Sequence, residues 1–325
     1  MKIDSDNVSE EIQKARPNVK PNTVKQYEVN LKKLQKLYDT DNYNFLSKPE
    51  DVMDKIKELH YLSQRNILNA IVVLLMALNH DEKYDDLLIT YGDLRDELND
   101  KYSDEQKSGV ISDKQSKNFT DIESIYKMIN QMAEDLKPIK KKSKDDLTKK
   151  EKQLLQAYTL FNIYSRMPMR NDVAGMTAIN QAAYKKLSEE DKKDNNYLVV
   201  PSKGNLYFVL NQYKTSKKYK ELDLPIEDKN LRKILRYYLK MNGTERGGIL
   251  FKTSTGKPLT RTELSKVLLK YSNKYMGKSI STTLLRKIYL SSKYGDIKKE
   301  LEKDNKVMGH SKAVALDTYV KEAQE

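Results

Sequence analysis

Apolar residues recur at helical spacing along most of this 325-residue chain, and this periodicity limits its possible folds more than any other feature. In the first such stretch, five apolar residues share one helix face, with lysines on the other faces: Val24, Tyr27, Leu31, Leu34 and Tyr38. The same spacing predicts further helices over residues 49–59, 63–79, 84–102, 120–135, 149–166, 227–241, 261–275 and 282–294, and a short one after residue 311. The chain is therefore expected to be mainly helical.

Local residues predict where some of these helices begin and end. Ser47 with Glu50, and Thr260 with Glu263, have the spacing of a capping box, in which each side chain bonds the backbone amide of the other residue. Gly295 is predicted to end the helix over residues 282–294.

Three short apolar stretches interrupt the helical pattern, at Tyr197–Val200, Leu206–Leu210 and Glu221–Leu224. The turn Lys203-Gly204-Asn205 and the polar segment Lys214–Lys220 separate them, which predicts a three-stranded antiparallel sheet. The expected fold class is mainly α with a small antiparallel β-sheet, an α+β arrangement.

The length indicates two domains, because a single core rarely grows beyond about 250–300 residues. Residues 103–118 are polar and lack a helical apolar stripe, so they are the predicted linker. We therefore expect a mobile N-terminal segment over residues 1–20, a helical domain over 21–102 and a second domain over 119–325. The lysine-rich run at 137–144 is predicted to be a solvated loop.

The composition argues against several classes of protein. The chain has no Cys and three His, which argues against disulfides, thiol nucleophiles and Cys- or His-based metal centres. It has no Gly-rich phosphate loop of the P-loop or dinucleotide type. The longest apolar run, Ala70–Leu78, is far shorter than the roughly 20 residues of a membrane helix, and no secretory signal is expected. We expect an intracellular protein with no membrane association that needs no metal or other cofactor.

The charge is concentrated in the second part of the chain. Lys and Arg number 60 against 47 Asp and Glu, a net charge of +13, which divides into −4 for residues 1–120 and +17 for residues 121–325. Coding from an AT-rich genome is an alternative explanation for the total, because fifty of the basic residues are Lys. The uneven distribution instead favours a phosphate-binding domain.

Arginine is rare here, so its positions are informative. Arg170 follows an apolar helix pattern, and Arg286 lies in Thr282-Thr283-Leu284-Leu285-Arg286-Lys287. A guanidinium binds phosphate through two parallel hydrogen bonds, whereas an ammonium does not. Further along, His310 stands 24 residues after Arg286, and Tyr319 stands nine after His310.

The order and spacing of Arg170, Lys214, Arg286, His310 and Tyr319 resemble those of the tyrosine recombinase (phage integrase) family. Two segments strengthen the resemblance: residues 250–260 are similar to the approach to the family's second arginine box, and Met308-Gly309-His310-Ser311 is similar to its Leu-Gly-His-Ser signature. Residues 22–27 and 63–68 resemble its core-binding domain. The resemblance implies a helical core-binding domain that clamps DNA and a catalytic domain from about residue 118 onward.

The resemblance also implies roles for these residues. Tyr319 would attack a DNA phosphate and form a 3′-phosphotyrosyl link, while Arg170 and Arg286 would bind the non-bridging oxygens. Lys214 would protonate the leaving 5′-oxygen, and His310 would hydrogen-bond the phosphate or assist proton transfer. Such an enzyme is a site-specific recombinase or integrase that acts on double-stranded DNA without metal or ATP, as a homo-oligomer, a tetramer on paired sites.

Some positions depart from the family pattern or leave alternatives open. Thr283 stands where the family has His or Lys, and it is either a phosphate donor or only a helix cap. Val173 stands where an acidic residue is usual, with Asp172 just before it. Lys217, Lys218 and Lys220 compete with Lys214 for the role of general acid, and Arg65, Lys217 and Lys287 are candidate DNA contacts.

The position of the nucleophile leaves two further questions open. Nine residues of straight helix span about 13.5 Å, so either the chain bends after His310 or Tyr319 serves a neighbouring protomer. If Tyr319 is not the nucleophile, Tyr289 and Tyr294 are the next candidates.

Three other functions fit parts of the pattern. A type IB topoisomerase shares the nucleophile and the arginines but relaxes supercoils as a monomer, and the spacing between Arg286 and His310 favours a recombinase over it. The substitution at Thr283 is compatible with a non-catalytic DNA-binding protein of the same fold. The third is a helical protein-interaction module, whose high Lys content would reflect coding from an AT-rich genome.

Overall fold

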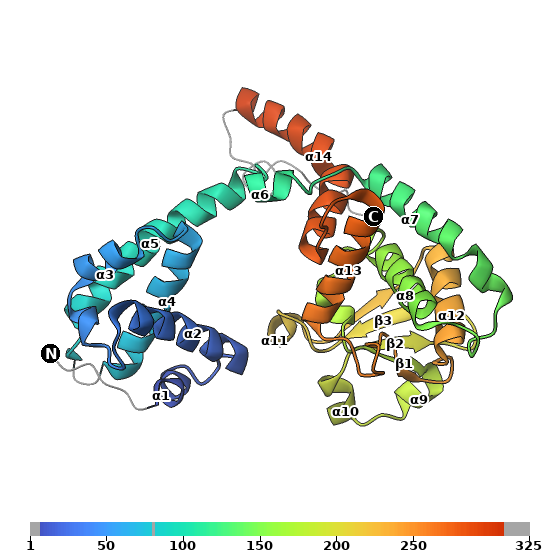
Figure 1. The fold of residues 1–325 in the computed structure, drawn as a ribbon, viewed down its shortest axis with the longest axis horizontal. Helices are drawn as coiled ribbons and strands as arrows, with labels where there is room; N and C mark the ends of the chain where they lie inside the picture. The colour runs from blue at the N-terminus through green and yellow to red at the C-terminus, as the bar shows by residue number, and fades with distance from the viewer. Residues whose placement is uncertain (1–6, 80–81, 309–325) are drawn as a thin grey trace. The chain divides into compact units, whose positions relative to one another are not determined.

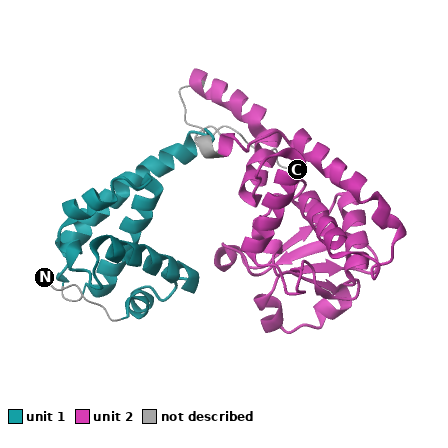
Figure 2. Cartoon of the chain, viewed as in Figure 1, with its two compact units in different colours: residues 1–111 teal, residues 112–325 magenta. Residues whose placement is uncertain are grey.

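The computed structural model describes residues 7–79 and 82–308 (Figure 1). The chain divides into two compact units, residues 1–111 and 112–325 (Figure 2). The boundary between them falls inside the polar segment 103–118, where the sequence places the linker. Each unit is described by itself.

Unit 1 is a helical unit organised around one apolar helix, α4. Its described elements are α1 (Val8–Ala15), α2 (Pro21–Tyr38), the 3-10 helix η1 (Asn44–Ser47), α3 (Pro49–Ile56), α4 (Tyr61–Leu78) and α5 (Asp85–Lys107). By length and composition alone α4 could cross a membrane, but half of it is buried inside the protein, and it packs against α1, α2 and α5. This burial is typical of a core helix.

Two details of unit 1 differ from the prediction. Residues 1–20 are expected to be mobile, yet α1 forms within them because Ile12 is completely buried against Val24 and Val73. The capping box predicted at Ser47 is also wrong. The residue preceding α3 is Lys48, and Ser47 instead ends η1, where its hydroxyl donates to the carbonyl of Asn44 at 2.8 Å.

Unit 2 contains a five-stranded mixed sheet with the strand order β4-β3-β2-β1-β5. The strands β2 (Tyr197–Val200), β3 (Tyr207–Leu210) and β4 (Leu222–Pro225) form an antiparallel meander. The sequence predicts these three strands but misses β1 (Thr177–Asn180), which is parallel to β2, and β5 (Gly248–Ile249). The purely antiparallel sheet is therefore wrong in detail, while the mainly helical α+β class is confirmed.

Helices surround this sheet, and α8 is central among them. The longer ones are α7 (Ile122–Asp135), α8 (Lys149–Tyr164), α12 (Lys229–Asn242), α13 (Arg261–Met276) and α14 (Thr282–Met308). The shorter elements are α6 (Asp113–Ser116), η3 (Lys137–Lys141), η4 (Asn171–Val173), α9 (Gln181–Lys185), α10 (Glu189–Asp194) and α11 (Ser216–Tyr219). Residues of α8 are buried on nearly every face because α7, α12, α13 and α14 all pack against it.

The beginning of α13 confirms the second predicted capping box, whereas the end of α14 differs from the prediction. The hydroxyl of Thr260 accepts from the amide of Glu263 at 3.2 Å, and the Glu263 carboxylate accepts from the Thr260 amide at 2.8 Å. Helix α14 does not end at Gly295 but continues to Met308. Glycine costs a helix interior only about 1 kcal/mol relative to alanine, and the residues that follow Gly295 are mostly good helix formers.

A buried glutamine links α8 to the segment after β5. The side-chain oxygen of Gln156 accepts from the amide of Lys252 at 2.9 Å and from the Tyr238 hydroxyl at 3.1 Å. Its side-chain nitrogen donates to the carbonyl of Lys252 at 3.1 Å. A substitution here would therefore remove the partners of both backbone groups of Lys252.

We expect Gln156→Leu to lower the free energy of unfolding by about 1–3 kcal/mol, the cost of leaving buried polar groups without partners. Urea denaturation followed by circular dichroism measures the change. Gln153→Leu, at a partly exposed position of the same helix, serves as the matched control and should change stability by less than about 0.5 kcal/mol. Equal effects of the two variants would contradict the role of Gln156.

Candidate active site

Arg170 lies just beyond the end of α8, at the residue that precedes η4. The buried hydroxyl of Tyr164, the last residue of α8, donates to the Arg170 carbonyl at 3.0 Å and so fixes the backbone there. The Arg170 side chain is exposed, and its guanidinium donates to no residue in the described part of the chain. The structure therefore presents this cation to solvent on a fixed backbone.

Arg286 reaches the same segment from the second turn of α14. Its Nε donates to the carbonyl of Pro168 at 3.1 Å, across 118 residues of sequence. The two terminal nitrogens of its guanidinium donate to none of the residues described in 7–79 and 82–308. One edge of the group is thus used for positioning, and the outer edge remains available for an anion.

A buried carboxylate, Asp172, lies among three arginines. The Nη2 of Arg261 is 3.0 Å from Oδ1 of Asp172, whose side chain is only 6% exposed. Burial raises the pKa of the Asp172 carboxyl, and the positive charges of Arg261, Arg170 and Arg286 act in the opposite direction. Arg170 and Arg286, far apart in sequence, therefore lie within electrostatic range of one anion.

Tyr164 lies next to this charged cluster but is not a candidate nucleophile. Burial raises the pKa of its phenol most strongly, and the negative charge of Asp172 raises this pKa further. The phenol is fully buried and its hydroxyl is engaged with the Arg170 carbonyl. Its role is to hold the loop that carries Arg170.

A buried asparagine connects this loop with the loop of Lys214. The Nδ2 of Asn196 donates to the carbonyls of Asp172 at 2.8 Å and Gln212 at 3.1 Å, while its Oδ1 accepts from the amides of Asn211 and Gln212. Arg261 adds a second link, from its Nη2 to the Gln212 carbonyl at 3.3 Å. The Arg170 and Lys214 segments are therefore held together by side chains that bond both.

Lys214 stands in the turn between β3 and α11, two residues after Gln212. It is exposed, and its ammonium pairs with no residue that the structure describes. The preceding residue, Tyr213, is buried, and its hydroxyl donates to the carbonyl of Lys220 at 2.8 Å. Lys217 is exposed on α11 in the same loop. Lys214 thus projects from a loop that is anchored immediately before it, which suits a proton donor.

Thr283 occupies the second position of α14, three residues before Arg286, and is exposed. It does not cap the helix, because the hydroxyl of Ser281 accepts from the amide of Leu284 at 3.3 Å. Its hydroxyl is therefore available as a hydrogen-bond donor one turn before the arginine.

Two of the candidate DNA contacts have partners inside their own unit. In unit 1, Arg65 donates from Nε to Asn99 at 2.6 Å and stacks 4.4 Å from the ring centroid of Tyr102. In unit 2, the ammonium of Lys287 donates to the side chain of Gln115 at 2.7 Å. Their structural roles are therefore clear, and the structure shows no free cation at either position.

His310 and Tyr319 lie outside the described residues. Of the other predicted catalytic residues, the structure brings Arg170 and Arg286 together and links them to the Lys214 loop. Three residues that organise this region are missed by the sequence prediction: Tyr164, Asn196 and Arg261. Of these, Arg261 had a usable signal, since it is one of ten arginines and follows the capping Thr260 directly.

Comparison of the chain with protein-family models, curated proteins and solved structures finds no match. Its function is therefore inferred from the geometry of these side chains and from the spacing of the sequence motif.

We expect Asp172→Asn to stabilise unit 2 relative to the parent as the pH rises. A carboxyl whose pKa is raised by folding contributes stability below its ordinary pKa of about 3.9 and loses that contribution as the pH rises through its folded value. The neutral amide loses nothing over this range. Urea unfolding at several values between about pH 4 and pH 8 measures the difference.

The control is Asp223→Asn, which removes an exposed carboxylate from β4. If Asp172→Asn is less stable than the parent at the upper end of the range, and the deficit shrinks toward the acidic end, the arginines outweigh burial and the expected sign is wrong.

Proposed function

We propose that this chain cleaves and rejoins double-stranded DNA through a covalent phosphotyrosyl intermediate, as a site-specific recombinase or integrase of the tyrosine recombinase type. The observation that carries the proposal is the pair Arg170 and Arg286, which lie within electrostatic range of Asp172 and whose terminal guanidinium nitrogens bond no described residue. Two such groups on a fixed backbone suit the non-bridging oxygens of one phosphodiester.

The proposed reaction needs one nucleophile and one proton donor. The Tyr319 oxygen attacks the phosphorus and gives up its proton to solvent or to His310, and the bond from phosphorus to the 5′-oxygen breaks. Lys214 protonates this leaving oxygen, and His310 hydrogen-bonds the phosphate or assists proton transfer. In the rejoining step a 5′-hydroxyl attacks the phosphotyrosine and Tyr319 is released. The covalent link conserves the bond energy, so the cycle requires no ATP.

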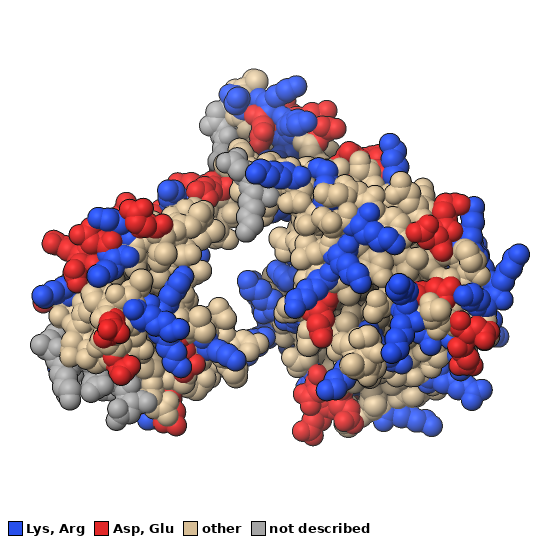
Figure 3. Space-filling view, in the orientation of Figure 1, with Lys and Arg blue, Asp and Glu red and all other residues tan. Residues whose placement is uncertain are grey.

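Charge in the second unit supports the same proposal. Residues 112–325 carry a net charge of +18, against −5 for residues 1–111. Figure 3 shows many Lys and Arg side chains on one face of unit 2, among smaller acidic groups. Arg170 and Arg286 would offset the charge that develops on the phosphate in the transition state, and Thr283 adds a neutral donor beside them. Assembly as a tetramer on paired DNA sites belongs to the proposal.

We expect Tyr319→Phe to abolish the covalent protein–DNA adduct on a nicked suicide substrate while duplex binding stays within about threefold of the parent. The substrate is DNA from the element that encodes this protein, because recognition is sequence-specific. Denaturing gels measure the adduct, and fluorescence anisotropy measures binding.

The matched variants are Tyr289→Phe and Tyr294→Phe. Tyr289 follows Arg286 by one helical turn and lines a cavity of about 410 Å³ beside Arg166, so it is the rival nucleophile closest to the cluster along the chain. An adduct that persists in Tyr319→Phe and disappears in Tyr289→Phe would move the assignment to α14. Binding by the parent without any adduct would favour a non-catalytic DNA-binding protein, and relaxation of plasmids without a specific site would favour a topoisomerase.

We expect Arg286→Lys to reduce cleavage by well over tenfold although the charge is kept. Lysine cannot reproduce the guanidinium bond to the Pro168 carbonyl or bind phosphate through two parallel hydrogen bonds. Single-turnover cleavage of the suicide substrate measures the rate. Arg236→Lys, an exposed arginine on α12, is the control and should retain parental activity. Near-normal cleavage by Arg286→Lys would contradict the proposed role.

A further inference from the structure

A second basic site lies at the other end of α8. A cavity of about 360 Å³ is formed by the first turns of α8, the end of α12 and the hairpin after β5. Four lysines line it: Lys144, Lys149, Lys152 and Lys252. One carboxylate, that of Asp145, is present among the lining residues.

The packing of α8 against α12 separates this cavity from the arginine cluster. At one end Arg166 follows α8 and pairs with Asp228, at the start of α12, at 3.3 Å. Halfway along α8, Gln156 bonds Tyr238, in the second half of α12. The two helices therefore run in opposite directions, and the cavity lies at the beginning of α8, whose 16 residues span about 24 Å.

The four ammonium groups have no ion-pair partner among the residues that the structure describes. None of them forms an ion pair or hydrogen bond with a residue in the described ranges. The neighbouring Lys142, outside the cavity, does pair with Glu151, at 2.7 Å. Like charges gathered around one hollow repel each other, and an anion that enters it removes this repulsion.

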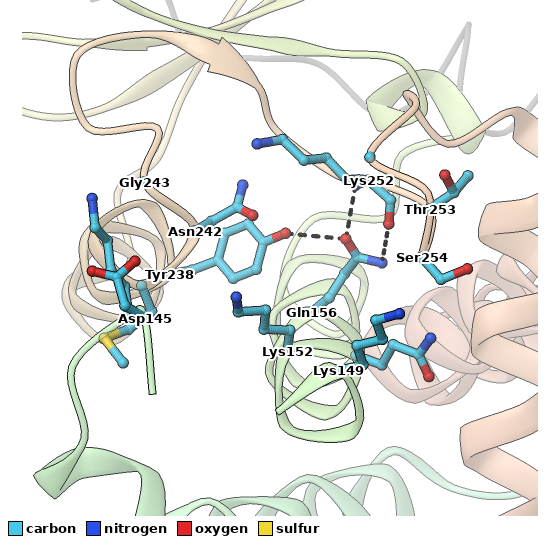
Figure 4. A pocket seen from close by; sticks show the side chains of 14 residues that line it. Asp145, Lys149, Lys152, Gln156, Tyr238, Asn242, Gly243, Lys252, Thr253 and Ser254 are labelled. Atoms are coloured by element: carbon cyan, nitrogen blue, oxygen red, sulfur yellow. Dashed lines mark hydrogen bonds between the residues drawn. The ribbon is translucent and has the colours of Figure 1, made fainter. Parts of the chain in front are cut away.

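Hydrogen bonds within the protein fix the walls of the cavity in the absence of a ligand. Gln156 bonds both backbone groups of Lys252, and the buried Tyr238 donates to Gln156. In Figure 4 the side chains of Lys152 and Lys252 lie on opposite sides of the Tyr238 ring.

We propose that this cavity binds a small polyphosphate anion, one that carries at least two phosphate groups, either free or attached to a nucleoside. Four ammonium groups exceed the charge of a single phosphate, which favours a ligand with several. The volume lies near the lower end of the range of small-molecule sites, about 300–1,000 Å³, so the site fits a triphosphate rather than a long polymer. The inference does not depend on strand cleavage.

The test is titration calorimetry of the full-length protein with inorganic tripolyphosphate at about 50 mM salt, where screening is moderate. We expect binding by the parent and a rise in Kd of at least about tenfold in the double variant Lys152→Gln/Lys252→Gln. A parallel titration with ATP distinguishes the two sources. Tighter binding of ATP indicates a nucleotide, and equal binding indicates that the phosphates alone are recognised.

The matched control is Lys233→Gln/Lys240→Gln, which removes two exposed lysines from α12 and changes the net charge equally. Its Kd should stay within about threefold of the parent. Circular dichroism checks that both variants remain folded. No binding by the parent, or equal weakening in the two variants, would overturn the proposal, since the second result would mean attraction by the overall charge alone.

Discussion

The buried carboxylate of Asp172 is the interaction on which the candidate active site depends. Arginines repel one another, so gathering three of them requires an anion, and this anion must be fixed by the fold. Asp172 is fixed because its backbone carbonyl bonds Asn196 and its side chain pairs with Arg261. Burial of this carboxyl opposes its ionisation. Burying the Asp172 carboxylate therefore has an electrostatic cost, at the residue around which the three arginines lie.

The same arrangement explains why Arg170 and Arg286 differ from Arg261. The guanidinium of Arg261 donates hydrogen bonds to the Asp172 carboxylate and to the Gln212 carbonyl, both of which belong to the protein. Arg170 and Arg286 influence Asp172 electrostatically, but no hydrogen bond joins either of them to it in the described structure. Tyr164 bonds the Arg170 carbonyl and the Pro168 carbonyl accepts from Nε of Arg286, so both arginines are held by groups other than the carboxylate.

Sequence periodicity predicts the long helices and the β2–β3–β4 meander because these elements carry their own apolar pattern. It misses β1 because only Ala178 and Ile179 of its four residues are apolar, and β5 because two residues are too few to show a pattern. The pairing of both strands depends on distant segments. The residues of the candidate site likewise divide into those that the sequence pattern reveals and those that it does not. Arg170, Lys214 and Arg286 are predicted from residue type, spacing and the family resemblance, whereas Tyr164 and Asn196 act through contacts that exist only after folding. Ordinary polar or aromatic residues of this kind carry no sequence signal.

The two basic regions of unit 2 also differ in how their cations are held, and this difference should govern what each can bind. The arginine cluster has a buried counter-ion, Asp172, and a carbonyl that accepts from Nε of Arg286, and these suit the proposed binding of one phosphate group. The lysine cavity has walls held by hydrogen bonds, but its ammonium groups have no partner in the described part of the chain. Lysine is a strongly hydrated point charge on a mobile stem, so this cavity can adapt to the length of a polyphosphate. Binding there should therefore be the more sensitive of the two to salt, because it relies on charge more than on directed hydrogen bonds.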